Sequence, residues 1–240
     1  MNRKIAVISD IHGNHHALSS VIEDMGKFDI DAVYCLGDVI SLGHQTNEVL
    51  ELLERLDNLT IIRGNHDDEV VKALRNMPSE VTGPEHDHHL WVAEHLDPKY
   101  QQFLGALPLT LEREVGVCSI LLTHYHLDAD AAYSPIDPAP SVKSLAHTYQ
   151  DEKYDLVLFG HDHMRHHFET DHQIFLNPGP LGVTSKAYAP YAIMEIENDG
   201  AIHIMHRNIH YDRKSFIDGL RKENPPAIDF ILNVLLKEGG

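Results

Sequence analysis

The sequence predicts an α/β fold in which a parallel sheet forms first and a second, antiparallel or mixed sheet packs on it. Residues 4–63 alternate apolar runs with amphipathic helical segments, the pattern of strands joined by helical crossovers. After residue 164 the pattern changes to short apolar segments separated by turns, which is typical of hairpins. With helices outside both sheets, these two patterns describe a sandwich of two sheets.

The opening segment contains three predicted strands joined by two helices. Near-continuous apolar runs predict the strands over residues 4–9, 32–36 and 59–63. Asn14 can cap the first helix, because apolar side chains recur at helical spacing from Ala17 to Met25. A second apolar helical face extends over 46–56. This order predicts parallel strands with right-handed crossovers.

The middle of the chain is predicted to be a helical excursion over about residues 67–107, which ends at Pro108. We expect helices over 67–76, 86–96 and 98–104, and a loop over 78–84. Strands over 109–114 and 117–123 follow, joined by a tight turn at Val115-Gly116. Next come a surface loop over 127–140, a helix over 141–150 and a strand over 154–159.

The last third is predicted to contain short strands and then helices. The strands are expected over 165–170, 173–176, 191–197 and 201–207, and we assign them to the second sheet. A turn at Asn198-Asp199-Gly200 makes the last pair a hairpin. Two C-terminal helices within about 212–238 are divided at Pro225-Pro226. No linker interrupts the pattern, so residues 1–240 are predicted to form a single domain.

Composition disfavours some classes of partner. The 240 residues are 42% hydrophobic and carry a net charge of −18 with histidine neutral. That charge disfavours extended binding of nucleic acid, which needs clustered Lys and Arg. A small phosphorylated substrate is compatible with it, because bound divalent ions supply local positive charge. No apolar run is long enough to cross a membrane, so we expect no membrane partner.

The two cysteines indicate a cellular compartment. Cys35 and Cys118 lie inside apolar, strand-like runs. We predict that they are buried free thiols of a cytoplasmic protein, although a disulfide between them is left open. The oligomeric state is also left open, a homo-oligomer included.

Residues of the types that bind metals come immediately after predicted strands. The carboxyl ends of strands in an α/β sheet converge on one crevice, so ligands distant in sequence can meet there. Asp, His and Asn without a thiolate suit a divalent Mn, Fe, Zn or Ni ion. Seven candidates are too many for one tetrahedral ion and suit two ions that share a bridge. The candidate metal ligands are Asp10, His12, Asp38, Asn65, His124, His161 and His163.

The series of motifs resembles that of the calcineurin-like metallophosphoesterases. The blocks are Asp10-Ile11-His12, Gly37-Asp38, Gly64-Asn65-His66-Asp67, His124 and Gly160-His161-Asp162-His163. The resemblance spans about residues 4–207 and is strongest to the small bacterial and archaeal phosphodiesterases, which are related to diadenosine tetraphosphatases. It implies the metallo-dependent phosphatase fold, a four-layer α-β-β-α sandwich of two mixed sheets with flanking helices. It also implies a phosphoesterase in which two divalent metal ions activate a bridging hydroxide.

The resemblance assigns a role to each candidate. It places Asp10, His12 and His163 on a first ion, Asn65, His124 and His161 on a second, and Asp38 between them. The candidate catalytic residues are His66, Arg63 and Asp67. His66 is implied to donate a proton to the leaving oxygen or to stabilise its charge. Arg63 matches a phosphate-contacting arginine of some branches, and a solvent-facing strand-end arginine is an equal alternative. Asp67 is expected to orient His66 or nearby backbone, or to cap the next helix.

Two blocks depart from the commoner family pattern. Tyr125 and His126 follow the histidine of the fourth block, where a glycine is commoner, and we expect both at the rim. His126 either touches substrate or lies on the surface, and we favour the surface. The turn Asn177-Pro178-Gly179-Pro180 resembles an Asn-Pro-Gly-Ser turn beside the metal site of small members. Substrate selection is expected to depend on loops over 42–45, 78–89 and 125–140. Their aromatic residues, and Trp91 nearby, either stack on a base or pack internally.

Several functions compete on these motifs. The first is a phosphoesterase acting on a phosphodiester or phosphomonoester, nucleotides included, with a dinucleoside polyphosphate hydrolase as the alternative. The second is a non-catalytic scaffold that binds protein partners, and the third is a metal-storage or sensing protein with its 20 histidines. The presence of His66 and of all seven candidate ligands favours the enzyme.

Overall fold

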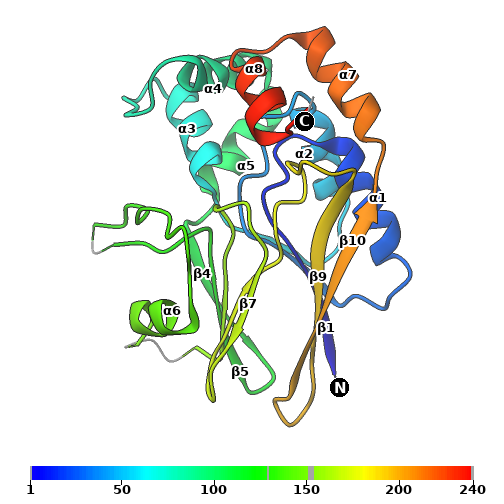
Figure 1. The fold of residues 1–240 in the computed structure, drawn as a ribbon, viewed down its shortest axis with the longest axis vertical. Helices are drawn as coiled ribbons and strands as arrows, with labels where there is room; N and C mark the ends of the chain where they lie inside the picture. The colour runs from blue at the N-terminus through cyan, green and yellow to red at the C-terminus, as the bar shows by residue number, and fades with distance from the viewer. Residues whose placement is uncertain (1, 129, 151–153, 239–240) are drawn as a thin grey trace.

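Two five-stranded mixed sheets pack face to face, with helices on their outer sides (Figure 1). The structure is a computed structural model that describes residues 2–128, 130–150 and 154–238. The predicted α-β-β-α sandwich is therefore confirmed. Residue 129 of the predicted surface loop, and both ends of the predicted 1–240 domain, lie outside the described residues.

The first sheet has the order β10-β9-β1-β2-β3. Strands β1 (Arg3–Ile8), β2 (Ala32–Cys35) and β3 (Leu59–Ile61) run parallel, as predicted. Helices α1 (His15–Met25) and α2 (Thr46–Glu54) form the crossovers. The side-chain oxygen of Asn14 accepts a hydrogen bond from the N–H of Ala17, so α1 begins just after the first motif block.

The predicted sheet assignment of the last hairpin is wrong. Strands β9 (Tyr188–Ile196) and β10 (Ile202–His210) form the predicted antiparallel hairpin. They belong to the first sheet, because β9 pairs antiparallel with β1 and sets Met194 opposite Ile5. The physical reason is that β9 is apolar on both faces: Met194 enters the core between the sheets, and Ile193 enters the core under the helices. Such a strand fits next to a central strand of either sheet.

The second sheet has the order β4-β5-β6-β8-β7. Its strands are β4 (Thr110–Val115), β5 (Cys118–Thr123), β6 (Leu156–Leu158), β7 (His166–Glu169) and β8 (Ile174–Asn177). The three central strands run parallel and both edge strands run antiparallel. Helix α6 (Val142–Thr148) covers the outer face, where Leu145 packs with Val157 and Phe175. The turn between β4 and β5 lies at Gly116-Val117, one residue later than expected.

A group of helices covers the end of the sandwich toward which β1, β2 and β3 run (Figure 1). They are α3 (Asn65–Leu74), α4 (Pro84–His95), a 3₁₀ turn (Pro98–Tyr100), α5 (Gln101–Ala106), α7 (Arg213–Glu223), α8 (Ile228–Phe230) and a π-helical turn (Ile231–Leu235). In Figure 1, α3, α4 and α8 lie together beyond the strand ends. Side chains at those ends are therefore covered by helices distant in sequence.

Apolar side chains fill the space between the sheets and the space under the helices. Val7, Leu36 and Leu122 are fully buried between the sheets. Cys35 and Cys118 are buried free thiols, as predicted. None of the described helices has both the length and the apolar character needed to cross a bilayer.

Candidate metal centre

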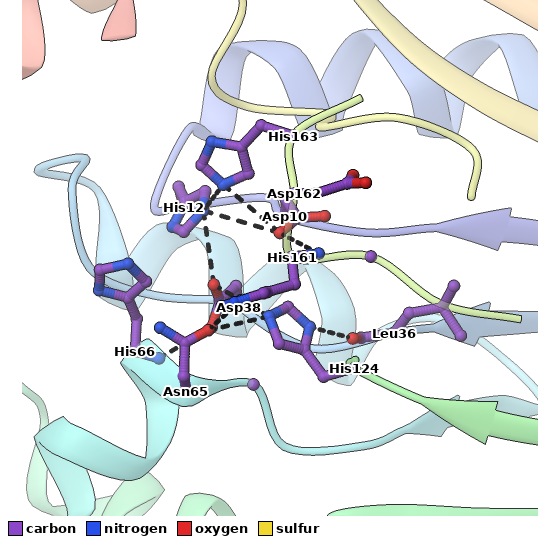
Figure 2. Close-up of polar contacts among 12 residues, drawn as sticks. Asp10, His12, Leu36, Asp38, Asn65, His66, His124, His161, Asp162 and His163 are labelled. Atoms are coloured by element: carbon purple, nitrogen blue, oxygen red, sulfur yellow. Dashed lines mark hydrogen bonds and ion pairs between the residues drawn. The ribbon is translucent and has the colours of Figure 1, made fainter. Parts of the chain in front are cut away.

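All seven sequence-predicted ligand residues lie in one cluster at the strand ends (Figure 2). Asp10 and His12 follow β1, and Asp38 follows β2. Asn65 opens α3 directly after β3, and His124 follows β5. His161 and His163 follow β6. Both sheets therefore contribute to the cluster, and the sandwich fixes their relative position.

The first group of donors contains Asp10, His12, Asp38 and His163, whose ligand atoms all lie within 4.8 Å of one another. Nε2 of His12 lies 3.0 Å from Nε2 of His163. The same nitrogen lies 3.9 Å from Oδ1 of Asp10 and 3.7 Å from Oδ2 of Asp38. Oδ2 of Asp10 is buried and has no hydrogen-bond partner in the described structure. A buried carboxylate oxygen without a donor is costly, so this group fits a cation.

The second group contains Asp38, His124 and His161, and Asn65 completes it. Oδ1 of Asn65 lies 3.1 Å from Nε2 of His124 and 2.8 Å from Nδ1 of His161. Nε2 of His124 lies 3.2 Å from Oδ2 of Asp38. Asp38 thus belongs to both groups, and a carboxylate with two oxygens can bridge two cations.

The paired donors converge through left-handed backbone turns. The φ angles are 54° at Asp10, 48° at His12, 73° at His161 and 54° at His163. The strands end before these pairs, so the alternation of side chains along an extended strand does not aim them. A left-handed non-glycine residue costs about 1–3 kcal/mol and persists only where its surroundings fix it. Such strain clusters at functional sites.

Two glycines of the motif blocks allow the loops to approach closely. A Cβ added to Gly64 would lie 2.1 Å from Oδ1 of Asp38. A Cβ added to Gly160 would lie 2.0 Å from Oγ of Ser9 and 2.8 Å from Oδ2 of Asp10. Any side chain at either position would displace a candidate ligand or its neighbour, which is why these blocks contain glycine.

Burial favours the neutral, metal-binding form of two cluster histidines, His12 and His161. Burial acts in the same direction on His124, but the charge of Asp38 and its hydrogen bond outweigh burial and raise the pKa of His124 to about 9. Burial holds the pKa of His12 well below its usual value, and burial together with the charge of His124 lowers the pKa of His161 to about 4. Burial also opposes the charge of Asp38, but His124 and His66 outweigh it and hold the pKa of Asp38 well below the ordinary value. Nδ1 of His124 lies 2.6 Å from the carbonyl oxygen of Leu36, to which it donates, so Nε2 faces the cluster.

Asn177 holds the loop that contains His161 and His163. Its Nδ2 donates to the carbonyl oxygen of Gly160 at 3.0 Å and to Oδ1 of Asp162 at 2.9 Å. Oδ1 of Asn177 accepts the N–H of Gly179 at 2.9 Å. The turn that begins at Asn177 therefore buttresses one motif block, a role that the sequence did not assign to it.

His66 lies next to the cluster and contacts a histidine that sequence reasoning did not identify. The backbone N–H of His66 donates to Oδ1 of Asp38 at 2.9 Å, and its ring centre lies 5.2 Å from that of His12. Nδ1 of His66 lies 2.8 Å from Nε2 of His89, a buried residue of α4. No motif marks His89, because its position depends on how the helical excursion folds back over the strand ends.

The contact between His66 and His89 favours one proton arrangement. Burial lowers the pKa of His66 to about 3 and also lowers that of His89, so both rings are neutral and each has one N–H. Nδ1 of His89 is buried without a partner in the described structure. A buried N–H without an acceptor costs more than an unused acceptor, so His89 donates from Nε2 to His66. The N–H of His66 then lies at Nε2, on the far side of the ring.

Asp67 orients backbone rather than the ring of His66. Its Oδ1 accepts the N–H groups of Val39 and Ile40 at 3.0 and 3.1 Å. Its Oδ2 accepts the N–H of Gly64 at 3.0 Å, which caps the start of α3. Burial, together with the charge of Asp38, raises the pKa of Asp67 to about 7. Asp67 therefore ties the segment after Asp38 to the segment that carries Asn65 and His66.

Arg63 is held by groups outside the cluster. Nη1 lies 2.8 Å from Oδ1 of Asp68, and Nη2 donates to the carbonyl oxygen of Gly105 at 3.1 Å. The side chain is 16% exposed, so the solvent-facing alternative is wrong. Contact between Arg63 and a phosphate stays a prediction.

The expectation that Tyr125 and His126 lie at the rim is wrong. They are 1% and 9% exposed, under α6 and the loop that precedes it. Nδ1 of His126 lies 2.6 Å from the hydroxyl of Tyr149, and the hydroxyl of Tyr125 accepts the N–H of Asp137 at 3.0 Å. Tyr133 does reach the cluster, where its ring stacks on His161 with centres 5.7 Å apart.

A family comparison agrees with this geometry. The family model described as "Calcineurin-like phosphoesterase superfamily domain" matches residues 3–199, which include every motif block. The chain belongs to this superfamily. Membership is consistent with a phosphoric ester hydrolase, and the donor cluster could hold metal ions.

Individual relatives cover the chain to different extents. An uncharacterised protein of Methanocaldococcus jannaschii is 27% identical over 92% of this chain and 93% of its own length. A symmetrical bis(5'-nucleosyl)-tetraphosphatase of Baumannia cicadellinicola is 40% identical, but over only 25% of this chain and 22% of its own length.

Two solved structures share the fold at low identity. A hypothetical protein of Pyrococcus horikoshii has a TM-score of 0.82 with 20% identity, over 97% of both chains. A metallophosphoesterase of Sphaerobacter thermophilus has a TM-score of 0.74 with 20% identity, over 100% of both chains. These similarities establish that the sandwich is that of the family.

Proposed function

We propose that the protein is a phosphoesterase that requires two divalent metal ions and hydrolyses phosphodiester or phosphomonoester bonds. The observation that carries the proposal is the pair of donor groups that share Asp38. Asp10, His12 and His163 serve one cation, and Asn65, His124 and His161 serve the other. Their nitrogen and oxygen donors suit Mn, Fe, Zn or Ni. When bound, such a pair acts as a Lewis acid toward phosphate and lowers the pKa of the attacking water.

The residues beside the cluster position the reacting groups. Asp38 receives the backbone N–H of His66, so the candidate bridge and the start of α3 are fixed relative to one another. The N–H at Nε2 of His66 is placed to donate a hydrogen bond or a proton to the leaving oxygen. His89 holds that tautomer through its contact at 2.8 Å. Asp67 acts on this chemistry only through backbone.

The alternatives differ in what they require. A dinucleoside polyphosphate hydrolase is supported by the short match to a tetraphosphatase, and it requires cationic groups for the additional phosphates. A non-catalytic scaffold or a metal-storage protein does not require His66 to be held in one orientation. The complete donor set together with the positioned His66 favours the enzyme.

Hydrolysis of bis(p-nitrophenyl) phosphate tests the proposal. We expect no turnover in metal-free protein and turnover after Mn²⁺ is added, with loss of most of it in His66→Ala. Metal analysis of the same samples should show that His66→Ala retains its metal. Metal binding without turnover of any phosphate ester would support storage or sensing, and absence of metal binding would support a scaffold.

A further inference from the structure

The metal cluster forms one end of a cavity of about 320 Å³. Asp38, Asn65, His66, His161 and His163 line that end. Apart from Glu85, His88 and Asp162, the rest of the lining is apolar. Its apolar residues come from three segments distant in sequence: the loop before α2, the segment before α6 and the C-terminal helices. The apolar lining residues are Leu42, Ile136, Ala227, Phe230 and Leu235.

The charges around this cavity are negative. Among the described residues that line it, the carboxylates are Asp38, Glu85 and Asp162, and none is Lys or Arg. A phosphate held at the metal cluster has its charge met by the cations there. A second or third phosphate further along the cavity would face Glu85 and apolar walls, without a cation to pair with.

Two of the apolar wall residues are unusually exposed. Ile136 and Phe230 are each 50% exposed at the cavity, although both are large and apolar. Phe230 is nonetheless held in place, because the next residue, Ile231, is 1% exposed in the main core. A fixed, half-exposed aromatic ring gains free energy when an apolar ligand covers it.

The position of His66 indicates which part of a substrate enters the cavity. His66 lines the cavity and is the residue proposed to act on the leaving oxygen. The group attached to that oxygen therefore extends between Ile136 and Phe230. A volume of about 320 Å³ is near the lower limit of ligand pockets, and it suits one aryl or short alkyl group.

We propose that this cavity binds an uncharged, largely apolar ester group of a substrate that carries a single phosphate at the metal cluster. The inference rests on the proposed function, since it places the phosphate on the cations. It makes Phe230 and Ile136 specificity-determining residues and disfavours substrates whose additional phosphates would extend into this cavity. Phe230 belongs to the C-terminal segment, to which the motifs assign no role.

Binding of alkylphosphonates to the Mn²⁺-loaded protein, followed by calorimetry, tests this inference without turnover. The series methyl-, ethyl-, propyl- and butylphosphonate keeps the phosphate mimic constant and lengthens the apolar group. If each added methylene is buried, the dissociation constant falls about fourfold per step. We expect Phe230→Ser to weaken butylphosphonate binding by about three- to tenfold and to flatten the dependence on chain length.

A matched control distinguishes loss of an aromatic ring that lines the cavity from loss of an exposed aromatic ring elsewhere on the protein. Phe103 is 42% exposed on α5 and does not line this cavity, so Phe103→Ser should keep the wild-type dependence on chain length. Ile136→Ser, from a different segment, should act like Phe230→Ser. It therefore keeps the test decisive if Phe230→Ser fails to fold.

The outcomes distinguish this inference from the proposed function. Dissociation constants that do not change with chain length, in protein that still hydrolyses bis(p-nitrophenyl) phosphate, overturn the inference and leave the function standing. A higher kcat/KM for diadenosine tetraphosphate than for aryl esters also overturns it and supports the alternative substrate. If neither phosphonate binding nor hydrolysis occurs, the proposed function itself is wrong.

Discussion

Removal of the imidazole of His89 tests how His66 acts. In His89→Ala, Nδ1 of His66 loses the donor that lies 2.8 Å away and remains largely enclosed. An unpaired buried polar atom costs about 1–3 kcal/mol, and His66 can avoid this cost by rotating its ring away from the orientation in which Nε2 faces the leaving oxygen. That orientation then becomes about 5 to 150 times less populated relative to the others. We expect kcat to fall by a factor in this range for substrates whose leaving oxygen needs His66, with KM nearly unchanged.

The assay compares aryl phosphodiesters whose phenol leaving groups differ in pKa. A p-nitrophenolate needs less help from a donated hydrogen bond or proton than an unsubstituted phenolate does. His89→Ala should therefore lose less activity with the first than with the second, so log kcat depends more steeply on leaving-group pKa. His89→Gln keeps an N–H donor and should restore part of the loss.

Two control variants make this result specific. His88 is as buried as His89 on the same helix, but its Nδ1 contacts the carbonyl oxygen of Pro226 and not His66. His88→Ala should therefore not change how steeply log kcat depends on leaving-group pKa. Glu85 lies near His66 and His89 in a third group that could hold a cation. Glu85→Gln should also leave the steepness unchanged, since the hydrogen bond does not involve it. Equal loss across all leaving groups in His89→Ala would refute the argument that His89 holds His66 toward the leaving oxygen.

Three further predictions concern the centre and the scaffold. Asp38→Asn should reduce the bound metal from two equivalents to one or fewer after dialysis, because it removes the charged bridge; full retention would contradict the sharing. Gly64→Ala should destabilise the fold by about 1–3 kcal/mol in urea titrations and weaken metal binding, because its Cβ would lie 2.1 Å from Oδ1 of Asp38. In Gly26→Ala the added Cβ would lie 3.4 Å from its nearest neighbour, so this control should lose little stability. Asp24→Asn should cost about 2–3 kcal/mol at pH 7, because Asp24 is 3% exposed and accepts two hydrogen bonds from Nη2 of Arg207, at 2.7 and 2.8 Å. Burial raises the pKa of Asp24, but Arg207 outweighs burial and lowers the pKa in the folded protein. The stability that the Asp24 carboxylate contributes is therefore present above about pH 4 and is lost as the pH falls through the pKa of Asp24 in the folded protein. A difference in unfolding free energy between variant and wild type that is the same at pH 3 as at pH 7 would contradict this.

The strand ends and the donor residues were predictable because their signals are local. A near-continuous apolar run such as that before Asp10 indicates a buried strand, and Gly64-Asn65 indicates a tight turn directly after one. The parallel order of the opening strands follows from the helices between them. The meeting of the blocks in one cluster then follows from the geometry of a parallel sheet.

Features that depend on long-range packing were not predictable. Strand β9, the first strand of the last hairpin, is apolar on both faces. Its sequence pattern therefore fits either sheet and does not identify β1 as the strand with which β9 pairs. His126 is polar and follows a motif residue, yet α6 and Tyr149 cover it. His89 and Phe230 reach the centre only because helices distant in sequence fold over the strand ends. Their spacing along the chain has no relation to the motifs.

The central claim is that Asp38 is shared by two cations a few ångströms apart. Titration of Mn²⁺ into metal-free protein, followed by electron paramagnetic resonance, tests it most directly. The account predicts two equivalents per chain and, at full occupancy, the multiline spectrum of a coupled pair, which Asp38→Ala should abolish. A single equivalent, or two equivalents with only the spectrum of isolated Mn²⁺, would contradict it.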